Sequence, residues 1–310
     1  CDIPNFGDAL NPVIFEKLAG MKIRLSPVDY ALIMGIGSLG DNLLMDKDGS
    51  FRKNPIRLFS TGIGFEEGKF FHNPNILLPE RLRRNVKCYA LRGKLTDARL
   101  SKMLGHPTGA VLGDGGLLVR YLIDADKIPK KYALGIVPHY ADKGSPVFSA
   151  IAKRIPNSRI LDPTALVDQF LHDLCECKAV ISTAMHPLIA CDALRIPNQW
   201  VRISETTTSR YKFHDYYSAF DKHKDPLDLT NHEFCQADLE ALMRKYDISD
   251  EQVFKVQRDL LMALLRLHVD LCQIKLQSML VRFVKLILRP TVWFVPVKRT
   301  RKRLRLFLKH

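Results

Sequence analysis

The chain has 310 residues, of which 46% are apolar and 26% charged, a balance that excludes a disordered protein and allows one or two folded domains. Its net charge of +14 is concentrated in residues 273–310, which contain eleven Lys/Arg and no Asp/Glu. The other residues carry 36 Lys/Arg against 33 Asp/Glu, which argues against a nucleic-acid groove across the fold.

The cysteines and the apolar runs indicate a cellular compartment. Seven cysteines stand at irregular spacing without a zinc-binding pattern, which favours a reducing compartment and predicts no metal site. No signal peptide is evident, and no apolar run reaches the roughly 18 residues that span a bilayer. We therefore expect a cytoplasmic protein.

Short apolar runs alternate with helical patterns in the first half, as is typical of parallel sheets covered by helices. The pattern predicts helices at residues 10–18 and 95–104. It predicts strands at residues 30–34, 56–60, 86–90 and 110–112. A polar stretch at 124–131 then reads as a linker.

The same alternation restarts after the linker. It predicts strands at 133–137, 159–161, 179–182 and 199–203, and helices at 147–154, 165–175 and 188–194. Residues 249–252 have the spacing of a capping box, and the helix that follows should end near residue 288, before Pro290. We predict an α/β fold with two Rossmann-like domains, 1–125 and 131–250, and an amphipathic helix with a basic tail at 251–310.

Glycine-rich loops follow several predicted strands. The loop at residues 35–40 fits GxGxxG, but no helix opens after it and no acidic residue follows at ribose-binding distance, so NAD binding is not favoured. A loop that approaches an anion or a sugar through its backbone is the better interpretation, with Gly35, Gly37 and Ser38 as candidates. Asn5, Gly7 and Asp8 form a similar turn, which either faces a ligand or simply initiates a helix.

Charged and titratable residues also stand at predicted strand ends. Arg92 is placed to hold a carboxylate or phosphate with paired hydrogen bonds, or to form a structural ion pair, and Asp114 has the same status. His139 and His186 each follow a strand of the second half, where an imidazole suits proton transfer near neutral pH.

Six sequence blocks in order resemble the polysaccharide pyruvyl transferase family. They are NFGDALNP, GIGS, ALRGKLT, LGDGGLL, IVPHYAD and the segment ISTAMHPLIACDALRIP, with a trailing YKFHDY. The resemblance implies a bacterial enzyme of exopolysaccharide biosynthesis with a GT-B-like fold. It implies phosphoenolpyruvate as donor, a sugar or lipid-linked oligosaccharide as acceptor, a pyruvate ketal as product and no cofactor.

The resemblance also implies roles for individual residues. His186 is the family's motif histidine and is expected to be the catalytic acid. Arg92 is an expected donor contact by the same resemblance. His139 is expected to bind the donor because of its place at a strand end, and Arg202 and Arg210 are further candidates for the donor's charge. Many members have arginine two residues before the histidine, where this chain has Ala184, and Pro187 replaces the usual glycine. A GT-B-type glycosyltransferase and a catalytically degenerate glycan-binding relative therefore remain alternatives.

The basic C-terminal segment predicts contact with a membrane surface. Polar residues recur at three and four positions along residues 275–289, and a cationic cluster follows at 298–303. Such a pattern favours peripheral binding at the inner face of the plasma membrane, and a helix packed on the body with a basic end is the alternative.

Overall fold

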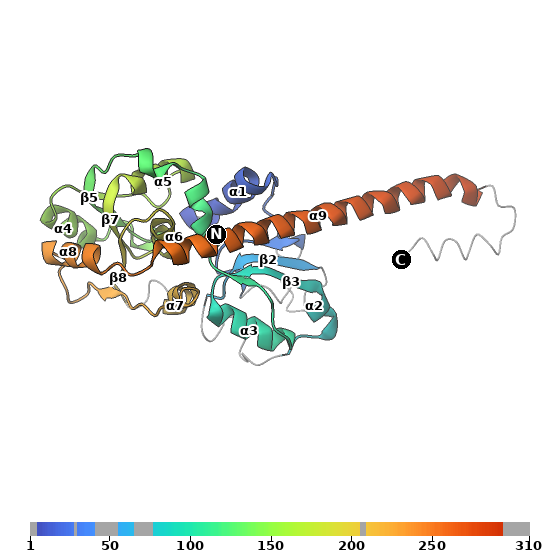
Figure 1. Ribbon diagram of the computed structural model, residues 1–310, viewed down its shortest axis with the longest axis horizontal. Coiled ribbons are helices and arrows are strands. Elements are labelled where there is room, and N and C mark those ends of the chain that lie inside the picture. The colour runs from blue at the N-terminus through green and yellow to red at the C-terminus, as the bar shows by residue number, and fades with distance from the viewer. Residues whose placement is uncertain (1–4, 28–29, 41–54, 65–76, 205–208, 294–310) are drawn as a thin grey trace. The chain divides into compact units, whose positions relative to one another are not determined.

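The computed structural model describes residues 5–27, 30–40, 55–64, 77–204 and 209–293, and for residues 282–293 it describes the backbone alone. Residues 1–265 form one compact unit and residues 266–310 a second. The first unit holds two parallel β-sheets with helices around them, which confirms the predicted α/β class (Figure 1). The finer domain boundaries at 1–125, 131–250 and 251–310 stay a prediction.

The first sheet has four parallel strands in chain order. They are β1 (Ile33–Met34), β2 (Ile56–Thr61), β3 (Val86–Leu91) and β4 (Val111–Leu112). All six residues of β2 are buried, as expected for an inner strand of a parallel sheet covered on both faces. Its Leu58 packs in one core with Met34, Leu100 and Met103.

Three helices precede or connect these strands: α1 (Phe6–Ala19), α2 (Glu80–Asn85) and α3 (Lys94–Leu104). The helix α1 begins four residues before its predicted start. Asn5 caps it by accepting a hydrogen bond from the N–H of Asp8 at 3.0 Å. Gly7 and Asp8 therefore lie in the first helical turn, which agrees with helix initiation, one of the two interpretations of this turn.

The second sheet has five parallel strands. Their spatial order is β6 (Ser158–Ile160), β5 (Tyr132–Val137), β7 (Cys177–Ser182), β8 (Asn198–Arg202) and β9 (Leu227–Asp228). The helices of this half are α4 (Pro146–Arg154), α5 (Val167–Cys175), α6 (Met185–Ala193), α7 (Arg210–Ser218) and α8 (Gln236–Lys245). Short 3₁₀ helices lie at Gly115–Tyr121 (η3), Ala125–Lys127 (η4) and Tyr140–Asp142 (η5), and η4 falls within the predicted linker.

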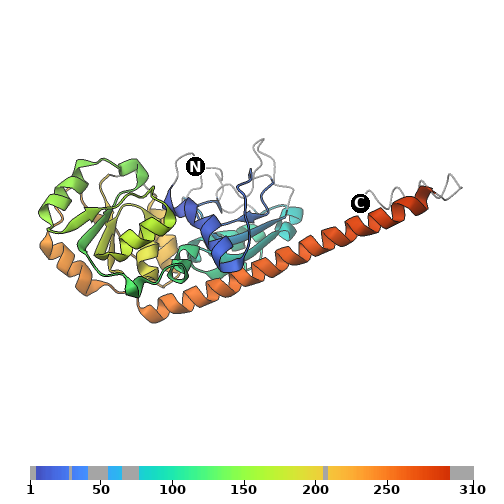
Figure 2. The same cartoon turned by 90° about the horizontal axis from the view of Figure 1, so that it is seen from above.

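The two sheets lie side by side in this unit (Figure 2). The helices α1 and α3 beside the first sheet contact helices beside the second sheet. The ring of Phe6 in α1 packs on that of Phe170 in α5, with 4.5 Å between centroids. The N–H of Lys94 in α3 donates to Ser218 Oγ of α7 at 2.8 Å. These contacts hold the two halves together beside the ends of their strands.

The helix α9 (Asp250–Trp293) starts with the predicted capping box. The N–H of Gln252 donates to Ser249 Oγ at 3.2 Å, and the N–H of Ser249 donates to Gln252 Oε1 at 3.4 Å. Gln257 then donates to the carbonyl of Leu117 at 2.9 Å, so the start of α9, which belongs to the first unit, packs on η3.

The end of α9 differs from the prediction. The helix passes through Pro290, and its described part reaches Trp293. Among the described residues, no helix is both long and apolar enough to cross a membrane. The cationic cluster at 298–303 lies outside the described residues, as do the side chains of Arg282, Lys285 and Arg289.

Candidate active site

Residues at the carboxyl ends of the strands form the candidate site, which is the edge where parallel α/β sheets bind ligands. Ser38 follows β1, Arg92 follows β3 and Asp114 follows β4, whereas His139 follows β5 and His186 opens α6 after β7. Direct contacts join two pairs of them, Ser38 with Arg92 and Asp114 with His186. The second pair joins the two sheets.

Arg92 is completely buried, and its guanidinium is bonded on three sides. Its Nε donates to Asp215 Oδ2 of α7 at 2.9 Å, its Nη1 donates to Ser38 Oγ at 2.9 Å, and its Nη2 donates to the carbonyl of Ile63. Gly62 lies against this group, since a Cβ built there would be 2.2 Å from Cζ of Arg92. Arg92 therefore forms a structural ion pair, which is one of its two sequence interpretations.

His186 and Asp114 face each other without a hydrogen bond. Nε2 of His186 lies 4.0 Å from Oδ2 of Asp114, and the imidazole is 15% exposed. Both atoms are buried and have no hydrogen-bond partner among the described residues. The other carboxylate oxygen, Oδ1, accepts from the N–H of Gly116 at 2.8 Å, which orients Asp114. Two unpartnered polar atoms that face each other mark a place for a proton or a ligand.

Burial shifts the pKa values of this pair in opposite directions. The pKa of His186 falls from 6.5 to about 3, through burial first and then through the nearby cations Lys212 and Arg92. The pKa of Asp114 rises from 3.8 to about 6, mainly through burial. The free protein therefore keeps His186 neutral at pH 7. An anion bound beside the imidazole would raise its pKa and favour its protonation.

The helix α1 supports the imidazole with its backbone. A Cβ built on Gly7 would be 2.1 Å from Nδ1 of His186, so the ring packs directly on the first turn of the helix. Asn5 and Asp8 partner each other at the exposed helix start, where Nδ2 of Asn5 donates to Oδ2 of Asp8 at 2.8 Å. Of these three candidates, Gly7 is the one for which the structure shows contact with the histidine.

The glycine-rich loop after β1 is closely packed. A Cβ on Gly35 would be 2.0 Å from Oδ1 of Asn11, and Asn11 exchanges hydrogen bonds of 2.7 and 2.9 Å with the backbone of Ile36. Gly37 has a φ of 131°, a conformation that favours glycine. The glycines thus fit the loop between α1 and the sheet and place Ser38 beside the guanidinium.

Comparison with known proteins identifies the family of the chain. The family model described as polysaccharide pyruvyl transferase matches residues 5–204, which is more than half of the chain. The chain belongs to the polysaccharide pyruvyl transferase family. The matched span includes Arg92, Asp114, His139 and His186.

Two relatives of this chain are distant. An uncharacterized protein, L143, of Acanthamoeba polyphaga mimivirus is 28% identical over 235 residues, which cover 71% of this chain and 72% of that protein. The succinoglycan biosynthesis protein ExoV of Rhizobium meliloti (strain 1021) is 22% identical over 213 residues, 68% of this chain and 60% of ExoV. No solved structure matches the chain significantly.

The matched pyruvyl transferase segment ends before α7, which carries a cation that the sequence analysis missed. Lys212 pairs with no carboxylate among the described residues, and burial, with a smaller contribution from Arg92, lowers its pKa to about 8. After burial, Lys212 is the largest cause of the lowered pKa of both His186 and His139. Its charge therefore lies near both histidines. The available signal was the segment YKFHDY, in which Lys212 is the single lysine.

Asp215 is the second residue that the sequence analysis missed. Besides Arg92, it accepts hydrogen bonds from the N–H and the hydroxyl of Thr96 at 2.9 and 2.7 Å. Gly93 allows the backbone of α7 to approach, since a Cβ there would be 1.7 Å from the carbonyl oxygen of Asp215. Asp215 thus fixes α7, and with it Lys212, against the end of β3.

The remaining predicted residues have other partners. His139 packs on Tyr140 with 4.2 Å between centroids, and its Nδ1 accepts from the N–H of Ala141 at 3.3 Å. Arg202 pairs with Asp228 of β9, and Arg210 is exposed at the start of α7. The cations that lower the pKa of the motif histidine do not include either arginine.

The site combines a neutral imidazole, a carboxyl group with a raised pKa and two cations. Arg92 is paired with Asp215, whereas Lys212 pairs with no carboxylate among the described residues. Such a set can hold a small multiply charged anion and move a proton beside it. Two groups of side chains in the described part of the chain are close enough together to share a metal ion, and neither contains these residues.

Proposed function

We propose that this family member transfers a pyruvyl group from phosphoenolpyruvate to a sugar of a polysaccharide or of its lipid-linked precursor, with a ketal as product. The observation that carries the proposal is the contact of His186 with Asp114, two buried groups that face each other beside Lys212 and Arg92. The name of the Rhizobium relative, a succinoglycan biosynthesis protein, supports a polysaccharide acceptor. A GT-B-like pair of domains belongs to the same proposal, and the two parallel sheets support it.

The donor requires contacts for a carboxylate and a phosphate. Lys212 is the best candidate because no carboxylate among the described residues neutralises its charge. Arg92 adds positive potential while its ion pair with Asp215 holds it in place. This arrangement would compensate for Ala184, which stands where many family members have an arginine. His139, Arg202 and Arg210 remain candidates for further donor contacts.

Ketal formation begins with protonation of the donor's methylene carbon, which becomes a methyl group. The adjacent carbon then accepts one sugar hydroxyl, the C–O bond to phosphate breaks, and a second hydroxyl closes the ketal. Of the two hydroxyl protons, one leaves on the inorganic phosphate and the other returns to the catalytic acid. We assign the acid to His186, with Asp114 as the partner that retains and returns the proton. Lys212 and Arg92 would stabilise the departing phosphate. This scheme uses no cofactor, and phosphoenolpyruvate is a co-substrate.

A binding experiment separates this proposal from the alternatives. Phosphoenolpyruvate at a hundred times its dissociation constant should stabilise the protein by about 2.7 kcal/mol in thermal unfolding. Lys212→Met should raise the phosphoenolpyruvate concentration needed for this stabilisation at least tenfold. The control Lys178→Met, which replaces an exposed lysine on β7, should leave that concentration unchanged. Stabilisation by nucleotide sugars alone would instead indicate a glycosyltransferase. Donor binding without acceptor-dependent phosphate release would indicate a degenerate relative.

We further propose that residues 273–310 bind the anionic inner face of a bacterial plasma membrane, where lipid-linked acceptors are found. The segment carries eleven Lys/Arg, and each cation near an anionic surface contributes about 1 kcal/mol. Sedimentation with anionic liposomes should pull down the full chain and leave a chain that ends at residue 272 in solution. Equal binding of both chains, or equal binding to neutral liposomes, would contradict the proposal.

A further inference from the structure

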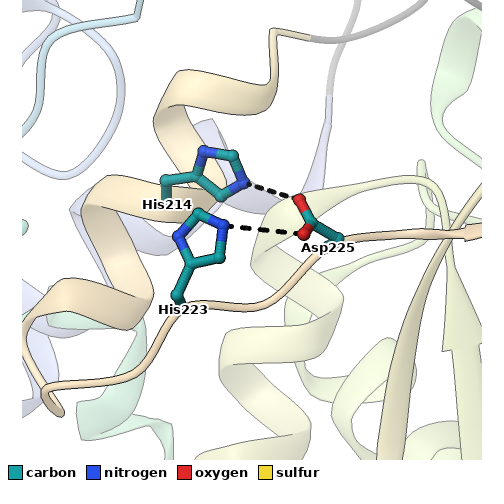
Figure 3. A group of neighbouring side chains, drawn as sticks. All are labelled: His214, His223 and Asp225. Carbon is teal, nitrogen blue, oxygen red and sulfur yellow. Dashed lines mark hydrogen bonds and ion pairs between the residues drawn. The ribbon is translucent and has the colours of Figure 1, made fainter.

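Two histidines and an aspartate converge beyond the candidate site, on α7 and on the segment that leads to β9 (Figure 3). Nε2 of His214 lies 3.3 Å from Oδ1 of Asp225, and Nε2 of His223 lies 3.5 Å from Oδ2 of the same carboxylate. The two imidazoles pack on each other with 4.4 Å between centroids. Both rings point their Nε2 atoms at one carboxylate from adjacent directions.

These separations match the ligand spacing of a small divalent ion. A tetrahedral zinc ion with bonds of about 2.0–2.1 Å to its ligands keeps neighbouring ligand atoms about 3.3–3.5 Å apart. One ligand atom from each of the three residues lies within 4.8 Å of the other two. Side-chain rotations that bring these three atoms to the ligand spacing would complete the site.

The charges around the group leave Asp225 available. The neighbouring Lys222 and Lys224 both pair with Asp247, at 3.1 and 2.7 Å. Within the described part of the chain, Asp225 has no lysine or arginine partner, and its two contacts are the imidazoles. A carboxylate with no permanent cation beside it keeps its affinity for a metal ion.

A second group of possible ligands provides a contrast. His172, Asp173 and Glu176 also lie close together, but their carboxylates are already neutralised. Lys131 pairs with Glu176, and Arg159 pairs with both acids. Binding a metal there would require breaking these ion pairs, so the group on α7 is the stronger candidate.

We infer that His214, His223 and Asp225 form a binding site for one divalent ion of the zinc class. Water would complete the coordination, because His223 and Asp225 are 69% and 66% exposed. Trp200 supports the inner ligand with its ring, whose centroid lies 5.9 Å from that of His214. The three ligands join the middle of α7 to the segment after it.

The position of the site on α7 indicates what the ion does. His214 lies between Lys212 and Asp215, the two residues of this helix that belong to the candidate active site. A bound ion would tether α7 at a third point, in addition to the bonds of Asp215 to Thr96 of α3 and to Arg92 after β3. The inference therefore assigns a structural ion, and it does not depend on the proposed pyruvyl transfer.

Metal titration of the full, tag-free chain tests this inference. After treatment with a chelator, ZnCl₂ should bind with one equivalent by calorimetry and should raise the unfolding temperature. Co²⁺ should give the visible absorption of a four-coordinate site. His223→Ala and Asp225→Asn should each weaken Zn²⁺ binding at least tenfold. Both side chains are exposed, so these variants should fold normally.

Matched controls separate this site from other exposed histidines. His232 contacts Asp238 at 2.9 Å without a third ligand, so His232→Ala should bind Zn²⁺ like the unaltered chain. His172→Ala reports on the second group of possible ligands. Stoichiometric binding that survives His223→Ala, or that disappears in either control variant, would overturn the assignment. Absence of stoichiometric binding by the unaltered chain would overturn it as well.

Discussion

Because Gly7 lies directly against the imidazole of His186, we predict that a larger residue at position 7 destabilises the protein. In Gly7→Ala the new Cβ would be 2.1 Å from Nδ1 and 2.6 Å from Cε1 of the imidazole, more than an ångström inside van der Waals contact. Overpacking of this kind costs about 1–3 kcal/mol, whereas alanine in place of a helical glycine gains about 0.5–1 kcal/mol. We expect Gly7→Ala to destabilise the protein by about 1–2 kcal/mol.

The same substitution should have the opposite sign once the imidazole is removed. In the His186→Ala background the clash is absent, so Gly7→Ala should stabilise the protein by about 0.5–1 kcal/mol. Urea unfolding of the four proteins gives the coupling energy, which we expect to be about 1.5–3 kcal/mol. Additivity of the two substitutions within about 0.5 kcal/mol would show that the helix start and the histidine do not touch. Because the ring must move by an ångström or more, activity of Gly7→Ala should fall about a hundredfold.

Two further predictions concern buried charges. Asp215→Asn removes the carboxylate partner of the fully buried Arg92 and should lower the free energy of unfolding by about 3 kcal/mol. The control Asp221→Asn breaks an exposed ion pair and should lower it by less than about 1 kcal/mol. Equal effects of the two substitutions in urea unfolding would contradict the burial of the first pair. Between pH 4 and 6, Asp114 is protonated in the folded chain and ionised in the unfolded chain, so its contribution lowers stability as the pH rises. Over the same range His186 is neutral in the folded chain and protonated in the unfolded chain, so its contribution raises stability as the pH rises. Asp114→Asn removes the first effect. From pH 4.5 to pH 6 the stability of this variant relative to the unaltered chain should therefore rise by about 1.5 kcal/mol. Parallel pH profiles of the two proteins would show that Asp114 titrates normally.

The sequence predicted the sheets well because inner strands of parallel sheets are continuous apolar runs. The runs at Ile56 and Val86 fall on β2 and β3, and the histidine expected after a strand opens α6 directly after β7. The predicted start of α1 was four residues too late, because a glycine and an aspartate near Asn5 resemble a turn. Only the capping geometry shows that Gly7 continues the helix.

The partners within the site could not be predicted, because they are far apart in the chain. Arg92 and Asp215 are 123 residues apart, and an arginine after a strand reads equally well as a free ligand contact or as half of an ion pair. The helix α7 was missed because its segment is dominated by polar and aromatic residues, although Phe213 and Tyr216 have helical spacing. Lys212 was therefore assigned to no element.

The most direct test of the account is a turnover experiment in D₂O with phosphoenolpyruvate and a lipid-linked oligosaccharide acceptor. We predict acceptor-dependent release of phosphate and a ketal whose methyl group carries one solvent deuteron, because the catalytic acid exchanges with solvent. His186→Gln should abolish both signals while urea unfolding shows a folded protein. A His186→Gln variant with activity within about twofold of the unaltered chain, corresponding to about 0.4 kcal/mol in the barrier, would contradict the central claim.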